Sequence, residues 1–190
     1  MRHIDEDQLE SDLQYRYEFL ADFIGYGPED AQLILASGPY LGPLIPQLVE
    51  ATYTKLLAFN ATARHFVPRQ SGYTGDLPAS LDDLTTTHPQ IQFRKEHLAR
   101  YLMQILTRST DRKLAVYLDM VGKIHTPKAG SGEIDVPLVQ MNALMGLLAI
   151  TLTETIMTQI SDTQLAMRTM RAFEKLMWIQ NDFINRHYQS

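Results

Sequence analysis

The 190-residue chain contains no cysteine, so disulfides, thiolate catalysis, iron–sulfur clusters and cysteine-ligated zinc are excluded. It also lacks runs of basic residues: 17 Lys and Arg are scattered among 22 acidic residues, and the net charge is −5. Nucleic acids and acidic membrane surfaces favour clustered positive charge, so neither is expected as the main partner. The polar, acidic start, MRHIDEDQLESDL, is unlike a secretory signal peptide, and a cytoplasmic location is the default expectation.

Strand patterns and Gly/Ser linkers are nearly absent, which predicts a single all-α domain over residues 1–190. The first helix is expected to carry Leu13, Tyr17, Leu20 and Phe23 along one side, and Asp162 is expected to cap the last helix. An irregular stretch from 68 to 89 holds at most a helical turn at 81–84. Apolar spacings of three and four residues predict helices over 9–24, from 28 to about 37, 46 to about 60, 90–108, Asp111 to about His125, 135 to about 160, and 163 almost to the C-terminus.

Residues 138–160 are the most apolar segment of the chain. Gln140, Asn142, Glu154 and Gln159 interrupt it, and each would be costly in hydrocarbon, so a membrane span is not expected. A helix that is apolar on most of its circumference is more simply buried twice, against its own core and against a partner chain. We therefore expect a homodimer through the last two helices, with apolar surface beyond the core-facing stripes at Leu147, Ile150, Leu152, Met167, Leu176 and Ile179.

Histidine is the residue type most able to carry chemistry in this sequence. No pair has the spacing of a helical zinc site. His125 follows Leu114, Leu118 and Val121 on one apolar stripe, just before the helix break at Pro127. In an apolar wall both ring nitrogens need partners. Either iron binds one nitrogen and a backbone carbonyl the other, or His125 is a core histidine that bonds to main chain only. The apolar stripe taken alone favours the core histidine. The other histidines are His65 and His97, His88 in a loop, and His3 and His187 at ends expected to fray.

Tyr53 lies in the middle of a second apolar stripe, between Val49 and Leu56. Its hydroxyl is expected to point inward, where it must find a hydrogen-bond partner. The pattern alone leaves two interpretations open, an ordinary core tyrosine that reaches a carbonyl and a ligand-facing donor.

Three stretches follow one another in the order found in a known family: Tyr17-Glu18-Phe19-Leu20 with Pro28-Glu29-Asp30, then Leu48 to Tyr53 with Leu56-Leu57, then Val121-Gly122-Lys123-Ile124-His125. Together with the two final helices, they resemble the sensor-globin lineage, the protoglobins and the haem domains of globin-coupled sensors. The resemblance implies a globin-like fold with extra N-terminal helices in residues 1–40 and a globin core in residues 44–188. Because the chain ends with the last globin helix, no fused output domain is expected.

The resemblance also implies haem b, with its iron bound by His125, and reversible binding of O2, CO or NO for sensing or scavenging. Tyr53 would be the distal hydrogen-bond donor, Phe66 would pack on the porphyrin and Leu98 would lie over the distal face. The remaining pocket residues implied are Tyr101, Val121, Met141 and Met145.

The sequence departs from the family pattern on the distal side. Thr52 stands where many protoglobins have an aromatic residue, and Leu98 replaces a common phenylalanine, which suggests a roomier distal side. Two alternatives remain: a haem-free globin-fold interaction module, and a haem enzyme such as an NO dioxygenase, which would need an external electron donor.

Overall fold

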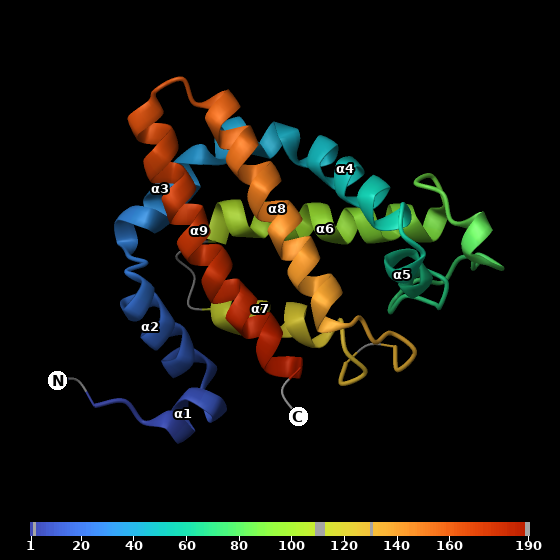
Figure 1. Cartoon of the computed structure of the whole chain (residues 1–190), viewed down its shortest axis with the longest axis horizontal. Coiled ribbons are helices and arrows are strands. Elements are labelled where there is room, and N and C mark those ends of the chain that lie inside the picture. Colours follow the sequence, from blue (N-terminus) through green and yellow to red (C-terminus); the bar gives the residue numbers. More distant parts are fainter. Residues whose placement is uncertain (2, 109–112, 130, 189–190) are drawn as a thin grey trace.

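The computed structural model describes residues 1, 3–108, 113–129 and 131–188, and within these ranges it contains helices and no strand. The predicted all-α class is confirmed (Figure 1). The α-helices are α1 (Glu6–Ser11), α2 (Leu13–Ile24), α3 (Pro28–Leu41), α4 (Ile45–Leu57), α5 (Asn60–Ala63), α6 (Pro89–Arg108), α7 (Leu114–Lys123), α8 (Leu138–Gln159) and α9 (Thr163–Asn185). Short 3-10 helices are η1 (Gly42–Leu44), η2 (Arg64–Phe66), η3 (Leu81–Asp83) and η4 (Arg186–Tyr188).

The expected first helix is two helices, because the chain is extended at Asp12. The Asp12 carboxylate accepts hydrogen bonds from the backbone N–H groups of Gln14 and Tyr15, so it caps α2 and ends α1. The apolar side of α2 is also narrower than predicted, since Phe23 is 81% exposed.

Helix α3 continues past Gly38 and Pro39 to Leu41, where the sequence predicted an end at 37. Proline removes one backbone hydrogen bond from a helix. Burial outweighs that loss here: Ile34, Ser37 and Leu41 are all buried, and the Ser37 hydroxyl donates to the Ile34 carbonyl oxygen at 2.6 Å.

The remaining boundaries follow the predictions closely. Helix α4 ends at Leu57, slightly early, and the turn at 81–84 is η3. Asp162 caps α9 through the N–H groups of Gln164 and Leu165. Asp111, the predicted start of the next helix, lies outside the described residues, and α7 begins at Leu114.

Helix α9 is the central element of the core, where it packs against α2, α3, α7 and α8 (Figure 1). Its buried face includes Phe173, Leu176, Ile179 and Phe183. Leu176 and Ile179 were predicted to extend the apolar surface beyond the core, and this was wrong. Both lie inside the protein's own core, which wraps around more of α9 than a single stripe.

The N-terminal helices are held on α9 by ion pairs. The Arg16 guanidinium, almost fully buried, contacts the Asp182 carboxylate with an Nε–Oδ2 distance of 2.6 Å. Lys175 contacts Asp30 at 2.9 Å and also donates to the Gly25 carbonyl oxygen. These contacts tie α2 and α3 to the helix at the centre of the fold.

Helix α8 leaves much of its surface uncovered. Among the described helices, it alone is long and apolar enough to cross a membrane, by length and composition only, and 22% of its most apolar window is buried. Val139 and Ile150 are 72% and 61% exposed. On α9, Trp178 is 67% exposed. Both final helices therefore present apolar side chains to the outside.

A candidate ligand cavity beside His125

A cavity of about 400 Å³ lies among α4, α6, α7, α8 and the inner side of α9. This volume falls within the range of small-molecule sites in proteins. The structure brings all the site residues that the sequence singled out to the wall of this one cavity: Tyr53, Phe66, Leu98, Tyr101, Val121, His125, Met141 and Met145.

His125 stands just after the end of α7, with its ring at the cavity wall. Its Nδ1 atom lies 2.7 Å from the Val121 carbonyl oxygen. A carbonyl oxygen only accepts, so Nδ1 carries the hydrogen and Nε2 keeps a free lone pair. Burial lowers the pKa of His125 to about 4; the charge of Arg94 acts in the same direction and the bond to Val121 opposes it. The imidazole is therefore neutral near pH 7, which is the form that ligates metals.

Helix α7 reaches its position because Gly122 has no side chain. A Cβ atom there would lie 2.7 Å from the Phe183 carbonyl oxygen and 2.8 Å from the Ile184 Cα, both backbone atoms of α9. The turn that follows is held as well, since the Val136 N–H donates to the His125 carbonyl oxygen at 2.9 Å. His125 is thus fixed from both sides by main-chain contacts.

A charged contact holds α7 to the C-terminal turn. The Asp119 carboxylate accepts from Arg186 Nη1 at 2.6 Å and lies 2.9 Å from His187 Nε2. The expectation that His187 lies at a frayed end was therefore wrong. Its side chain is 11% exposed, held by a carboxylate far away in the sequence.

Tyr53 faces the same cavity from α4 and is 3% exposed. Its ring packs on Phe66, with 5.6 Å between the ring centroids. Within the described ranges, no backbone carbonyl accepts from its hydroxyl, whereas the neighbouring Thr52 hydroxyl donates to Leu48. Burial raises the pKa of Tyr53, and the charge and hydrogen bond of Arg94 oppose that rise. The hydroxyl therefore stays protonated, as a donor.

The sequence profile of the protoglobin family matches residues 13–190. The chain belongs to the protoglobin family. Among solved structures, the globin domain of the Geobacter sulfurreducens globin-coupled sensor superposes with a TM-score of 0.72 and 17% identity, covering 91% of this chain and 97% of that domain. At that identity the likeness establishes the fold, which is globin-like as predicted. No curated protein matches the chain.

Membership places this chain among the globins. Its cavity also contains polar side chains that the sequence analysis did not assign. Arg94, His65 and Gln140 line it together with Tyr101. Within the described residues, one polar atom of each is buried without a hydrogen-bond partner: Arg94 Nε, His65 Nε2, Gln140 Oε1 and Tyr101 Oη.

These polar atoms are left for whatever fills the cavity, so its wall suits a ligand that has polar parts as well as apolar ones. Arg94 could have been found from the sequence, because it lies one helical turn before Leu98 and so shares its face. His65 is adjacent to Phe66 in the sequence. Neither neighbourhood distinguishes a cavity residue from an ordinary solvated one.

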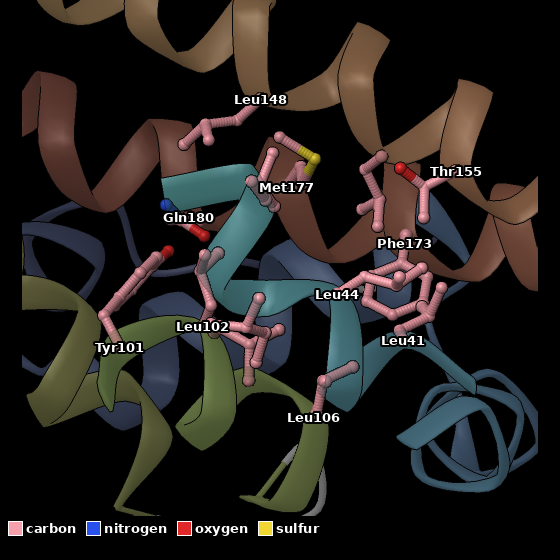
Figure 2. A pocket seen from close by; sticks show the side chains of 14 residues that line it. Leu41, Leu44, Tyr101, Leu102, Leu106, Leu148, Thr155, Phe173, Met177 and Gln180 are labelled. Carbon is pink, nitrogen blue, oxygen red and sulfur yellow. The ribbon is translucent and has the colours of Figure 1, made fainter. Parts of the chain in front are cut away.

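A second cavity of about 70 Å³ adjoins the first in this protoglobin. Its wall is mostly leucine and isoleucine from α3, α4, α6 and α8, with Phe173 and Met177 from α9 (Figure 2). Tyr101, Leu148 and Gln180 line both cavities and lie on one side of the smaller one (Figure 2). The two spaces therefore share part of their wall.

Proposed function

We propose that the protein binds haem b through His125 and reversibly binds a diatomic gas on the opposite side of the haem plane. The observation that carries this proposal is the geometry of His125. Its Nδ1 is committed to the Val121 carbonyl, and its neutral Nε2 belongs to a ring at the wall of a 400 Å³ cavity. Histidines that ligate metals are oriented in this way, by donating their second nitrogen to a carbonyl or carboxylate.

The lining of the cavity suits a large, mostly apolar group that also has polar parts. Phe66, Val121, Met141 and Met145 supply apolar wall. The unpartnered atoms of Arg94, His65 and Gln140 supply polar contacts. Bound haem would supply an iron with one open coordination position for O2, CO or NO. The apolar wall would keep water away from that position.

Tyr53 is the candidate donor to the gas. Its buried, protonated hydroxyl lacks a carbonyl acceptor among the described residues, so it is free to donate to a ligand with partial negative charge. Such a bond is worth roughly 1–2 kcal/mol, or about tenfold in affinity. Tyr53 would therefore favour O2 over CO, which develops less charge.

Absorption spectra of the purified protein, oxidised, reduced and with CO, test this proposal directly. An intense haem band that shifts on reduction and again with CO is expected. Protein that contains no haem and takes up none when haem is added would instead support the haem-free interaction module. Turnover of NO with an added electron donor would support the enzyme.

We also propose that the protein is a homodimer through α8 and α9. The supporting observation is exposed apolar surface on both helices, at Val139, Ile150, Met157, Leu165, Met167 and Trp178. Apolar surface of this kind marks interaction sites, and two-fold pairing of two helices from each chain would bury it in a four-helix bundle. Pairing would cover α8 without a membrane, in keeping with the expected cytoplasmic location.

A further inference from the structure

The charged side chain in the cavity wall has no carboxylate partner. Arg94 lines the cavity from α6, and among the described residues no Asp or Glu forms an ion pair with it. Its Nε atom is buried without an acceptor. The next residue shows the contrast, because Lys95 contacts both the Glu50 carboxylate and the Thr86 carbonyl oxygen. Among the described residues, Arg94 therefore lines the cavity as a cation that no carboxylate neutralises.

The surroundings of Arg94 add no negative charge to the wall. Three histidines line the same cavity, His65, His97 and His125, and the described lining residues include no Asp or Glu. Asp135 acts on His65 from outside the wall. Arg94 is half-buried and no acid of the wall offsets its charge, so a cavity of this composition favours a ligand with negative charge.

Arg94 lies on the same side of the cavity as the distal tyrosine. Helices α4 and α6 pack against each other, and Arg94 is near enough to Tyr53 for its charge and a hydrogen bond to act on the tyrosine hydroxyl. Arginine has only donors, and the protonated tyrosine has a donor to offer. Both residues line the cavity, so Arg94 can offer an N–H and Tyr53 its O–H to one small anion bound there.

We propose that Arg94 and Tyr53 form an anion site on the distal side, so that a small inorganic anion bound to ferric iron is held by both side chains. This inference rests on haem binding through His125. Such a site would select ligands by charge, because Arg94 would raise the affinity for ligands that bind as anions and not for neutral ones. Azide and fluoride are suitable probes, and imidazole is a neutral one.

The test is absorption titration of the ferric holoprotein with azide, fluoride and imidazole. Replacing Arg94 with leucine should weaken azide and fluoride binding by at least about tenfold, the value of a hydrogen bond to a charged group, and affect imidazole much less. Arg94→Lys keeps the charge, so its azide and fluoride affinities should lie between those of the wild type and Arg94→Leu. Arg100→Leu is the matched control, because it removes the same charge from an exposed position on the same helix outside the cavity wall, and its affinities should stay at the wild-type level.

A carboxylate of the haem itself is the other possible source of negative charge for Arg94. The rate of haem loss to an excess of an acceptor protein distinguishes the two. Faster haem loss from Arg94→Leu, with unchanged azide and fluoride affinities, would overturn the proposal. Weaker anion binding with an unchanged rate of haem loss would support it.

Circular dichroism verifies that each variant is folded. If Arg94→Leu does not fold, the same titrations are made with Arg94→Lys. Wild-type protein that takes up no haem would overturn the proposed function together with this inference. A normal haem band with equal anion affinities in the wild type and in Arg94→Leu would overturn this inference alone.

Discussion

The Nδ1 atom of His125 lies 2.7 Å from the carbonyl oxygen of Val121, one helical turn earlier. This contact selects the tautomer whose free lone pair is on Nε2. An ordinary core histidine makes the same contact, with its other nitrogen facing apolar side chains. Here the ring faces a cavity, and that difference is what mutagenesis can test.

Replacing His125 with alanine should yield folded protein without stoichiometric haem, because the iron loses its protein ligand. The measurement is the ratio of haem to protein in the purified sample, with added imidazole as a rescue. His97→Ala is the control, since His97 lines the same cavity and should leave haem content unchanged. Full haem content and an unchanged ferrous spectrum in His125→Ala would contradict the assignment.

The pKa of His125 also predicts a pH dependence of stability in the apoprotein. The folded value, about 4, lies below the ordinary 6.5, so between these values the unfolded chain binds the extra proton. Stability should therefore fall as the pH drops from 6.5 toward 4. From pH 7 to pH 5, the wild type should lose about 2 kcal/mol relative to His125→Leu, which cannot titrate there. Urea unfolding of both proteins at the two pH values measures this difference, and equal losses would show that the imidazole is hydrated.

Replacing Tyr53 with phenylalanine removes only the hydroxyl, and the packing on Phe66 should remain. Oxygen dissociation from the ferrous protein should accelerate severalfold, up to about tenfold, because one hydrogen bond is lost. Carbon monoxide release should change little. Stopped-flow kinetics with both gases decide the matter, and equal acceleration for the two gases would mean that Tyr53 acts by steric contact.

Replacing Gly122 with alanine should destabilise the protein by about 1–3 kcal/mol, because the new methyl group meets the backbone of α9, which must shift. Urea unfolding measures the loss, and a lower haem affinity should accompany it as α7 moves. Gly38→Ala is the matched control: a Cβ there meets nothing within 4 Å, and this interior position of α3 should gain about 0.5–1 kcal/mol. A Gly122→Ala variant as stable as the wild type would contradict the close approach of the two helices.

Replacing Ile150 with glutamate should convert the proposed dimer into a monomer, because a charge would enter the apolar surface of α8. Ile150 is 61% exposed, so the change spares the core. Sedimentation at micromolar concentration should give twice the 21.7 kDa chain mass for the wild type and one chain mass for the variant. Phe23→Glu, an exposed position on α2, should stay dimeric. A wild-type monomer would contradict the proposal.

Local rules predicted much of this fold, and long-range packing decided the rest. Apolar spacing located α6, α8 and α9, and a capping aspartate located the start of α9. The continuation of α3 through Pro39 follows from burial of residues around it, which no local rule contains. The division into an extension of residues 1–40 and a core of residues 44–188 stays a prediction.

The candidate site also contains residues that the sequence could predict and residues that it could not. His125 and Tyr53 stand out in the sequence because a polar group within an apolar stripe needs an explanation. Arg94 does not, since a cation on an amphipathic helix is by default solvated. Its importance depends on which acids are absent from its surroundings, and only the folded structure shows that.

At Gly122 the main chain of α7 lies directly against the main chain of α9, with the His187 ring beside the contact. A side chain at an interface can change rotamer and take up a small movement of its neighbour, whereas main chain in a helix cannot. We therefore expect α7 and α9 to move as one rigid lever. A ligand that displaces His125 would then also displace α9, which carries Trp178 on its outer surface. The fluorescence of this single tryptophan would therefore change with what occupies the cavity.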